Sequence, residues 1–201
     1  VPEARRGFHE LWGMAWDERT LVINEAAAPI PSENNEKPHI TGPVMFVSDT
    51  QNDRICKIEF SATSHTTPAK VTEFVTNSAD AWDVVYSGGV IYVSERKAHR
   101  IAAYDARTGA YLRTVVQGAA LATVNVNRFV VRSASLASIQ AQPCVAPEGL
   151  YKLADEPWLY FGSFAMQQVR RVHLATGEVQ VMCDVPVDGN SQFFKIAVSD
   201  G

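Results

Sequence analysis

The sequence predicts an all-β fold in which a unit of four short antiparallel strands recurs along the chain. Three observations predict it: alternating runs of β-branched and aromatic residues are frequent, segments with helical periodicity are scarce, and the chain aligns with itself at long period. Four antiparallel strands per unit, at a period of about 40–50 residues, are typical of a β-propeller blade. We therefore expect a β-propeller built of four-stranded antiparallel blades.

The second and third strands of each unit give the clearest pattern. The second strands are expected at Val44–Ser48, Val90–Ser94 and Trp158–Gly162. After a polar turn, the third strands follow at Arg54–Phe60, Arg100–Tyr104 and Val169–Leu174. A shift of 46 residues places the Val-Ser-Asp sequence at 47–49 on the Val-Ser-Glu sequence at 93–95 without a gap. The first two units are therefore repeats of one another.

The outer and inner strands complete the unit. A shared Thr-Gly turn, at 108–109 and again at 176–177, supplies a glycine for positive φ before the fourth strand. Fourth strands are expected at Val71–Val75, Ala110–Val116 and Glu178–Cys183. First strands are expected in register at Glu10–Trp16, Asp80–Tyr86, Ala146–Lys152 and Gln192–Val198. The repeat therefore begins four times.

These strands divide the chain into three blades and the start of a fourth. Blade 1 covers about 9–76 with an insertion at 24–42, blade 2 about 79–117, blade 3 about 146–185, and blade 4 starts at about 191–201. A second insertion, 118–144, is strand-like at 124–131 and either strand or short helix at 133–141. Because an open arc of blades leaves two apolar faces in water, we expect the rest of the ring to come from the same longer chain or from a second copy.

Composition sets limits on function. The 201 residues include 18 Lys and Arg against 22 Asp and Glu, a net charge of −4, which does not favour nucleic acid as a partner. Hydrophobic residues make up 46% and charged residues 20%, as in globular proteins. No apolar run approaches the roughly 20 residues of a transmembrane helix. The one basic stretch, Arg96–Arg100, is expected on a turn.

Blade 2 resembles a known repeat. The stretch from Trp82 to Ser94, then His99-Arg100-Ile101, Tyr104-Asp105 and Thr108-Gly109, looks like an NHL repeat. The match is weaker in blade 3, where Gln168 stands in place of the arginine. The resemblance implies a propeller of the six-bladed type, related to the gluconolactonase-like propellers. It identifies the fold better than the function, because sites are grafted on widely shared folds.

Carboxylates stand at the start of the inner strands. Glu10, Asp80 and Glu148, with Gln192 in the fourth unit, are expected where the inner strands enter the central channel. Several oxygen ligands suit Ca²⁺ or another hard divalent cation, and the resemblance to gluconolactonase-like propellers implies such a metal. The alternative, which we favour, is that they are ordinary polar residues at strand starts.

Aromatic residues recur beside the same positions. Trp12, Trp82 and Phe193 could stack on a sugar or a peptide, which makes them candidate ligand-binding residues. The alternative, again favoured, is packing between blades, where one buried aromatic ring contributes roughly 1.5–3 kcal/mol.

The nucleophiles and bases form no recognisable catalytic set. The five histidines do not cluster in the sequence: His9, His39, His65, His99 and His173. The three cysteines, Cys56, Cys144 and Cys183, lack the spacing of a zinc site. They are interpreted equally well as three buried free thiols or as a Cys144–Cys183 bridge with Cys56 free.

The sequence therefore favours a non-enzymatic, NHL-like recognition or scaffold module. Its partner would be a protein or a small-molecule or glycan ligand on a propeller face. Composition leaves the compartment open. Our hypothesis is that the module acts outside the cell or on its surface. The alternative is a metal-dependent hydrolase or lactonase of the gluconolactonase-like type, with its site at the central channel.

Overall fold

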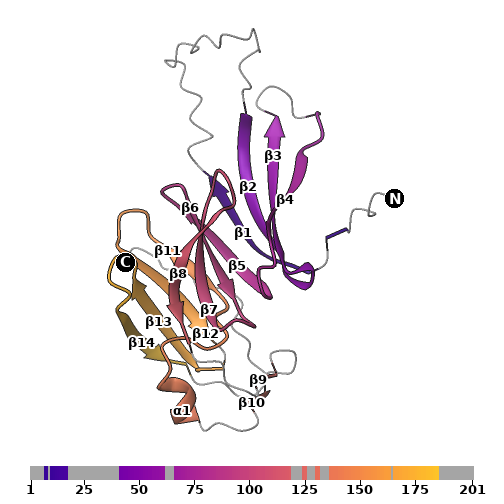
Figure 1. The fold of residues 1–201 in the computed structure, drawn as a ribbon. Coiled ribbons are helices and arrows are strands. Elements are labelled where there is room, and N and C mark those ends of the chain that lie inside the picture. The colour runs from indigo at the N-terminus through magenta and orange to yellow at the C-terminus, as the bar shows by residue number, and fades with distance from the viewer. Residues whose placement is uncertain are drawn as a thin grey trace.

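In a computed structural model of the 201 residues, the described residues form three four-stranded antiparallel sheets and one two-stranded sheet (Figure 1). The structure describes residues 7–8, 10–17, 41–61, 66–118, 124–125, 130–131, 136–163 and 165–185. In each four-stranded sheet the strands are paired in sequence order, so each of these sheets is a meander with its first strand at one edge and its fourth at the other. This is the strand order of a propeller blade.

The bounds of the strands follow the repeat. Blade 1 consists of β1 (Leu11–Asp17), β2 (Thr41–Asp49), β3 (Arg54–Ser61) and β4 (Lys70–Thr76). Blade 2 consists of β5 (Ala81–Ser87), β6 (Val90–Glu95), β7 (Arg100–Asp105) and β8 (Tyr111–Gln117). Blade 3 consists of β11 (Leu150–Lys152), β12 (Trp158–Ser163), β13 (Gln168–His173) and β14 (Val179–Asp184). A short 3-10 helix, Thr50–Asn52, joins β2 to β3.

The expected all-β fold is confirmed, with one strand shorter than expected. The inner strand of blade 3 begins at Leu150 instead of Ala146. Its entry residue is followed by Pro147, which has no N–H to donate, whereas Leu11 and Ala81 follow the entry residue in the other two blades. The fourth blade at about 191–201 and most of the insertion at 24–42 lie outside the described residues, so these boundaries stay predictions.

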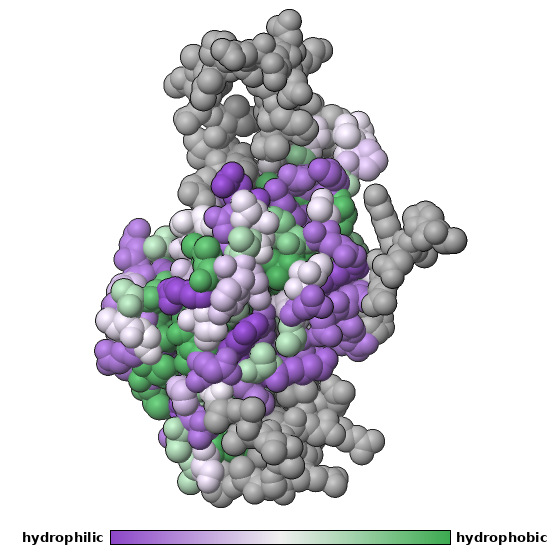
Figure 2. All heavy atoms as spheres, viewed as in Figure 1, coloured by the Kyte–Doolittle hydropathy of each residue, from purple (hydrophilic) through white to green (hydrophobic). Residues whose placement is uncertain are grey.

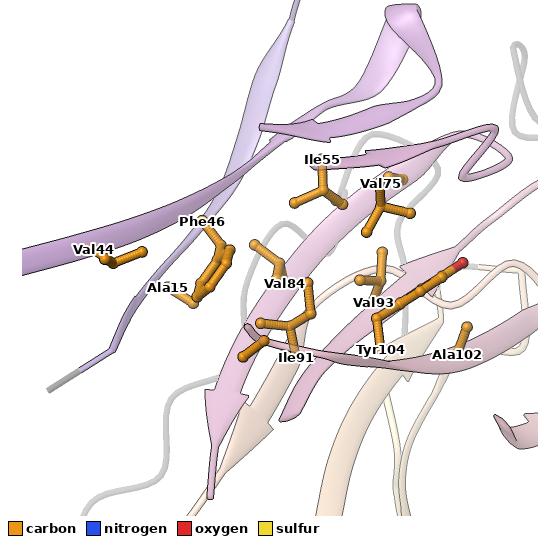
Figure 3. Close-up of a cluster of buried hydrophobic side chains, with 12 residues drawn as sticks. Ala15, Val44, Phe46, Ile55, Val75, Val84, Ile91, Val93, Ala102 and Tyr104 are labelled. Carbon is orange, nitrogen blue, oxygen red and sulfur yellow. The ribbon is translucent and has the colours of Figure 1, made fainter. Parts of the chain in front are cut away.

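Blade 2 lies between blades 1 and 3, and its inner strand β5 contacts both β1 and β11 (Figure 1). One hydrophobic cluster fills the space between blades 1 and 2. There Ala15 and Phe46 of blade 1 face Val84 and Ile91 of blade 2 (Figure 3). A second cluster fills the space between blades 2 and 3, with Tyr92 of blade 2 and Leu159 of blade 3 among its members. We call each of these two interfaces a joint.

The Thr-Gly turns form as expected, and they are alike in detail. Gly109 and Gly177 both have a φ of 74°, and each donates its N–H to the carbonyl of the residue four positions earlier, at 2.8 Å. In blade 2 the Asp105 carboxylate accepts the N–H groups of the turn, and in blade 3 the Nδ1 atom of His173 does so. Two different side chains therefore stabilise one turn geometry.

The second insertion contains a two-stranded ladder, β9 (Val124–Asn125) with β10 (Val130–Val131), and a short helix, α1 (Leu136–Gln140). All three cysteines are free thiols. Cys144 is buried in the joint between blades 2 and 3, whereas Cys183 is exposed on the edge strand β14. The bridge considered from the sequence is therefore not formed, and neither are three buried thiols. Among the described residues, no helix has the length and hydropathy needed to cross a membrane.

Candidate functional site

The candidate site is a stack of three side chains at the inner strands of blades 1 and 2. The indoles of Trp12 on β1 and Trp82 on β5 lie nearly parallel, with ring centroids 4.7 Å apart and an interplanar angle of 13°. The guanidinium carbon of Arg96 lies 3.8 Å from the centroid of Trp82. Trp82 is 5% exposed and Trp12 is 44% exposed. The stack therefore joins a buried cation to an indole that reaches the surface.

Two buried carboxylates surround the guanidinium. The Nε atom of Arg96 donates to Oδ2 of Asp80 at 2.7 Å, and its Nη1 atom lies 3.9 Å from Oε1 of Glu148. The exposed ammonium of Lys97 lies 3.8 Å from the other oxygen of Asp80. Buried charges are tolerated when they are paired and hydrogen-bonded, and the Arg96 side chain has both kinds of contact. These contacts hold the Arg96 plane against Trp82.

The backbone that carries these groups repeats from blade to blade. Glu10, Asp80 and Ala146, each at the entry to an inner strand, all have positive φ, at 59°, 55° and 41°. Pairing with the second strands places Glu148 two positions beyond this entry, in the place that Trp12 and Trp82 occupy in their blades. Glu148 was predicted at the strand entry together with Glu10 and Asp80. This prediction is wrong, because the structural equivalent of Glu10 and Asp80 in blade 3 is Ala146.

A serine hydroxyl fixes each joint beside the site. The Oγ atom of Ser48 accepts the N–H of Gly13 in its own blade at 2.7 Å and donates to the carbonyl of Trp82 in the next blade at 2.9 Å. Ser94 repeats the arrangement, with the N–H of Asp83 at 2.9 Å and the carbonyl of Glu148 at 2.8 Å. The serine of the Val-Ser-Asp/Glu pattern is thus a blade-to-blade bridge, which positions Trp82 and Glu148.

A second repeated contact caps the entry residue of the following blade. Oδ1 of Asp53 accepts the backbone N–H of Asp80 at 2.7 Å. At the next joint, Nδ1 of His99 accepts the backbone N–H of Ala146 at 3.0 Å. Asp53 and His99 also share a left-handed backbone, with φ of 49° and 51°. Each cap fixes the start of an inner strand relative to the preceding blade.

The expected metal ligands are brought together in part. Asp80 and Glu148 both face Arg96, which provides their positive charge. Glu10 is exposed, and its backbone carbonyl accepts the N–H of Thr50. Within the described part of the chain, no group of three or more His, Cys, Asp or Glu side chains is placed to hold a metal ion. His9, Gln192 and Phe193 lie outside the described residues.

The residue that sequence reasoning missed is Arg96. The stretch Arg96–Arg100 was expected to be a basic patch on a turn, but Arg96 and His99 are buried, and Arg100 is half-buried beside Glu95. Only Lys97 of this stretch is exposed. The self-alignment places Arg96 in the same column as Thr50, directly after the second strand and beside the inner-strand entry, but it does not show that the arginine side chain turns inward.

A recess of about 670 Å³ lies elsewhere on blade 1, on β3, β4 and the segment before β1. Its walls include the apolar groups of Phe8, Cys56 and Val71 and the charged groups of Arg54 and Glu73. Arg54 is paired with Asp49 and Glu73, so its charge is neutralised within the blade. This recess is separate from the residues of the Trp12 stack.

No protein-family model matches the chain, and no curated protein matches it in sequence. Among solved structures, it is similar to a protein of unknown function from Bacteroides thetaiotaomicron, at 13% identity and a TM-score of 0.47 over 92% of this chain and 34% of that one. It is also similar to virginiamycin B lyase from Staphylococcus aureus, at 13% identity and a TM-score of 0.40 over 73% and 39% of the two chains. A third similar structure is a candidate 6-phosphogluconolactonase from Bacteroides uniformis. Its sequence identity is 12% and its TM-score is 0.39, over 71% of this chain and 52% of that one. The chain thus spans about a third to a half of these proteins.

Proposed function

We propose that this chain is a recognition module on a β-propeller scaffold, of the NHL-like kind, which binds its ligand at the exposed indole of Trp12. The observation that carries the proposal is the stack of Trp12 on Trp82, with Arg96 held against Trp82 by Asp80. The exposed indole rests on a buried and ion-paired support. The module would act outside the cell or on its surface.

The physical reason is preorganisation. A tryptophan presents a large ring with only two rotatable side-chain bonds, and a fixed ring loses little conformational freedom when a ligand binds. The parallel arrangement with Trp82 holds the Trp12 ring in one orientation. An indole face suits the C–H face of a sugar ring or the side chain of a proline or aromatic residue in a peptide. We therefore expect a neutral glycan or a peptide rather than a strongly charged ligand.

The test compares Trp12→Ala with Tyr111→Ala on arrays of neutral oligosaccharides and of proline- or tyrosine-containing peptides. Tyr111 is a matched control, because it is an aromatic residue with 52% exposure that lies on the outer strand of blade 2. We expect the wild-type chain to bind one class of probe, Trp12→Ala to lose about tenfold in affinity, and Tyr111→Ala to keep it. Equal binding by Trp12→Ala, or no binding of any probe by the wild-type chain, would contradict the proposal.

A second candidate function is the metal-dependent hydrolase or lactonase. The observation that favours it is the convergence of two buried carboxylates, Asp80 and Glu148, at one point beside the inner strands. Calorimetric titration with Ca²⁺, together with lactone hydrolysis, separates the two functions. Stoichiometric Ca²⁺ binding that Asp80→Asn abolishes would favour the enzyme. Under the recognition proposal the guanidinium of Arg96 already compensates these carboxylates, and Ca²⁺ binding is not stoichiometric.

A further inference from the structure

Blade 1 carries a continuous apolar row on the face that points away from blade 2. The row crosses all four strands in register: Trp16 pairs with Met45, Met45 with Ile58 and Ile58 with Val71. Trp16 is 47% exposed, Val71 is 45% exposed, and Met45 and Ile58 are half-buried. We call these four residues the blade 1 row. Figure 2 shows hydrophobic side chains among hydrophilic ones on the visible surface of the molecule.

In the other two blades, the members of the equivalent rows on the second and third strands are buried in the joints, whereas Tyr111 on the outer strand of blade 2 is 52% exposed. In blade 2 the row runs through Tyr86, Ile91 and Tyr104, and both Ile91 and Tyr104 are at most 5% exposed. In blade 3 it runs through Leu159 and Val172, which are fully buried. A row at this place in a blade is therefore a surface that a preceding blade covers, at both joints where the structure shows it.

The covering surface is also a repeated row. In blade 1 it contains Ala15 and Phe46, and the ring of Phe46 stacks on Tyr86 of blade 2, with centroids 6.3 Å apart. In blade 2 its equivalent contains Tyr92, which is buried against blade 3. The matching row of blade 3 pairs Tyr151 with Tyr160, Tyr160 with Arg171 and Arg171 with Gln180. All four are half-buried, and we call them the blade 3 row.

The described blades thus carry both halves of a joint, one on blade 1 and one on blade 3. Blade 2 separates the two ends, so the blade 1 row and the blade 3 row face away from each other (Figure 1). The entry residue and the capping residue of such a joint are present as well. Glu10 has the entry conformation of Asp80 and Ala146, and Gln167 has the left-handed conformation of the two caps, Asp53 and His99, with a φ of 54°. A Gln side-chain carbonyl can accept a backbone N–H as those caps do.

We propose that a second copy of this chain covers these surfaces, with the blade 3 row of each copy packed on the blade 1 row of the other. Tyr160 then occupies the place of Phe46, and Trp16 the place of Tyr86, so the two rings stack across the interface. The contact joins different surfaces of the two copies, and a two-fold axis makes it twice. The three described blades of each copy make a ring of six, within the usual range of about four to eight. In this ring the partner's blade 1 takes the place in which residues 191–201 were predicted to start a fourth blade.

The composition of the two rows fits this occupant. The blade 1 row is wholly apolar, and the blade 3 row offers two tyrosines for it to pack on. Arg171 is held in place by Gln180 and lies over Trp158, with its guanidinium carbon 4.2 Å from the ring centroid. Tryptophan, tyrosine and arginine are the residues most enriched at the energetic centres of protein interfaces. A strongly charged ligand would find no matching charge on the blade 1 row.

The experiment measures the mass of the 201-residue chain in solution by light scattering, over a wide range of concentrations. We expect twice the 22.1 kDa of one chain for the wild type, and 22.1 kDa for Trp16→Glu and for Tyr160→Glu. Leu112→Glu is the matched control, because Leu112 is 50% exposed on β8 and belongs to neither row. It should keep the dimer mass. Circular dichroism of each variant verifies that it is folded.

Complementation makes the test decisive. A mixture of Trp16→Glu and Tyr160→Glu retains one intact joint, between the Tyr160 surface of the first variant and the Trp16 surface of the second. The mixture is therefore expected to recover the dimer mass, although each variant alone is monomeric. A wild-type chain of 22.1 kDa throughout, a dimer that Trp16→Glu leaves intact, or a mixture that stays monomeric would each overturn the proposal.

Discussion

The two joints have the same geometry but different chemistry. At both, a buried serine hydroxyl links the inner strands of adjacent blades, through Ser48 at the first joint and Ser94 at the second. At both, a residue in the left-handed conformation caps the next entry residue. The cap is the carboxylate of Asp53 at the first joint and the imidazole of His99 at the second. The repeat therefore conserves the position of an acceptor atom, not the chemical group that supplies it.

The difference extends to the inner surface. At the first joint the serine bonds to Trp82, which lies between Trp12 and Arg96, whereas at the second it bonds to Glu148. Both contacts use the backbone carbonyl, so the joint does not depend on which side chain is present. The side chains at this place are free to differ, and they supply the indole stack at one joint and a buried carboxylate at the other. A repeated scaffold thus carries a site that is not repeated.

The largest effect is expected from removing the shared hydroxyl. Ser48→Ala leaves the N–H of Gly13 and the carbonyl of Trp82 without this partner, and Ser94→Ala does the same at the second joint. Each buried polar group that loses its partner costs about 1–3 kcal/mol, so each variant should lose about 3 kcal/mol of unfolding free energy. Chemical denaturation measures this loss.

Equal losses at the two joints would show that the bridge acts in the same way at both. Ser87→Ala is the control, because Ser87 is half-buried at the far end of β5 and should lose less than about 0.5 kcal/mol. If Ser48→Ala were neutral, the hydroxyl would not be the element that fixes the first joint.

A smaller effect separates the two Thr-Gly turns. Both glycines have a φ of 74°, but a Cβ atom at Gly109 would lie 2.4 Å from the carbonyl oxygen of Phe74 in blade 1, whereas one at Gly177 would have no described atom within 4 Å. Gly177→Ala should cost about 1 kcal/mol for the left-handed backbone alone. Gly109→Ala should cost about 2 kcal/mol, because the neighbouring backbone must also shift. Thermal unfolding of the two variants gives the difference, and equal losses would contradict a turn packed against blade 1.

The repeat made the fold predictable from the sequence. Strand alternation and self-alignment located every described strand of the three blades, because side chains alternate between the two faces of a sheet. The inner strand of blade 3 begins later than the self-alignment predicts, because Pro147 after its entry residue cannot donate to the ladder. The bonds of Ser48 across the joint were not predictable, because alternation along a strand does not show which blade lies opposite a side chain.

The candidate site was predictable only in part. Trp12, Trp82, Asp80 and Glu148 were all identified from their place beside the inner strands. Their arrangement depends on Arg96, which the sequence presents as one of several basic residues on a turn. Whether an arginine lies on the surface or reaches back between two carboxylates is decided by the backbone path after the second strand. That path follows from packing between blades, and local sequence patterns do not encode it.

The smallest expected effect is a pH dependence confined to the second joint. Burial lowers the pKa of His99 below its ordinary value of 6.5. The unfolded chain therefore takes up a proton at a higher pH than the folded chain does. The stability that neutral His99 provides is complete above about pH 6.5 and is lost progressively as the pH falls below that value. Because protonation turns the Nδ1 acceptor into a donor facing the N–H of Ala146, about 1 kcal/mol should be lost by about pH 5.

His99→Asn tests whether this loss belongs to the cap. An asparagine tolerates the φ of 51° and offers a side-chain carbonyl that does not titrate, so the variant can keep the acceptor while removing the ionisation. Unfolding free energies of the wild-type chain and the variant, measured by denaturation at several pH values, should converge or cross as the pH falls. A wild-type loss that persists in His99→Asn would show that acid acts elsewhere, and the two joints would then differ in composition but not in their response to pH.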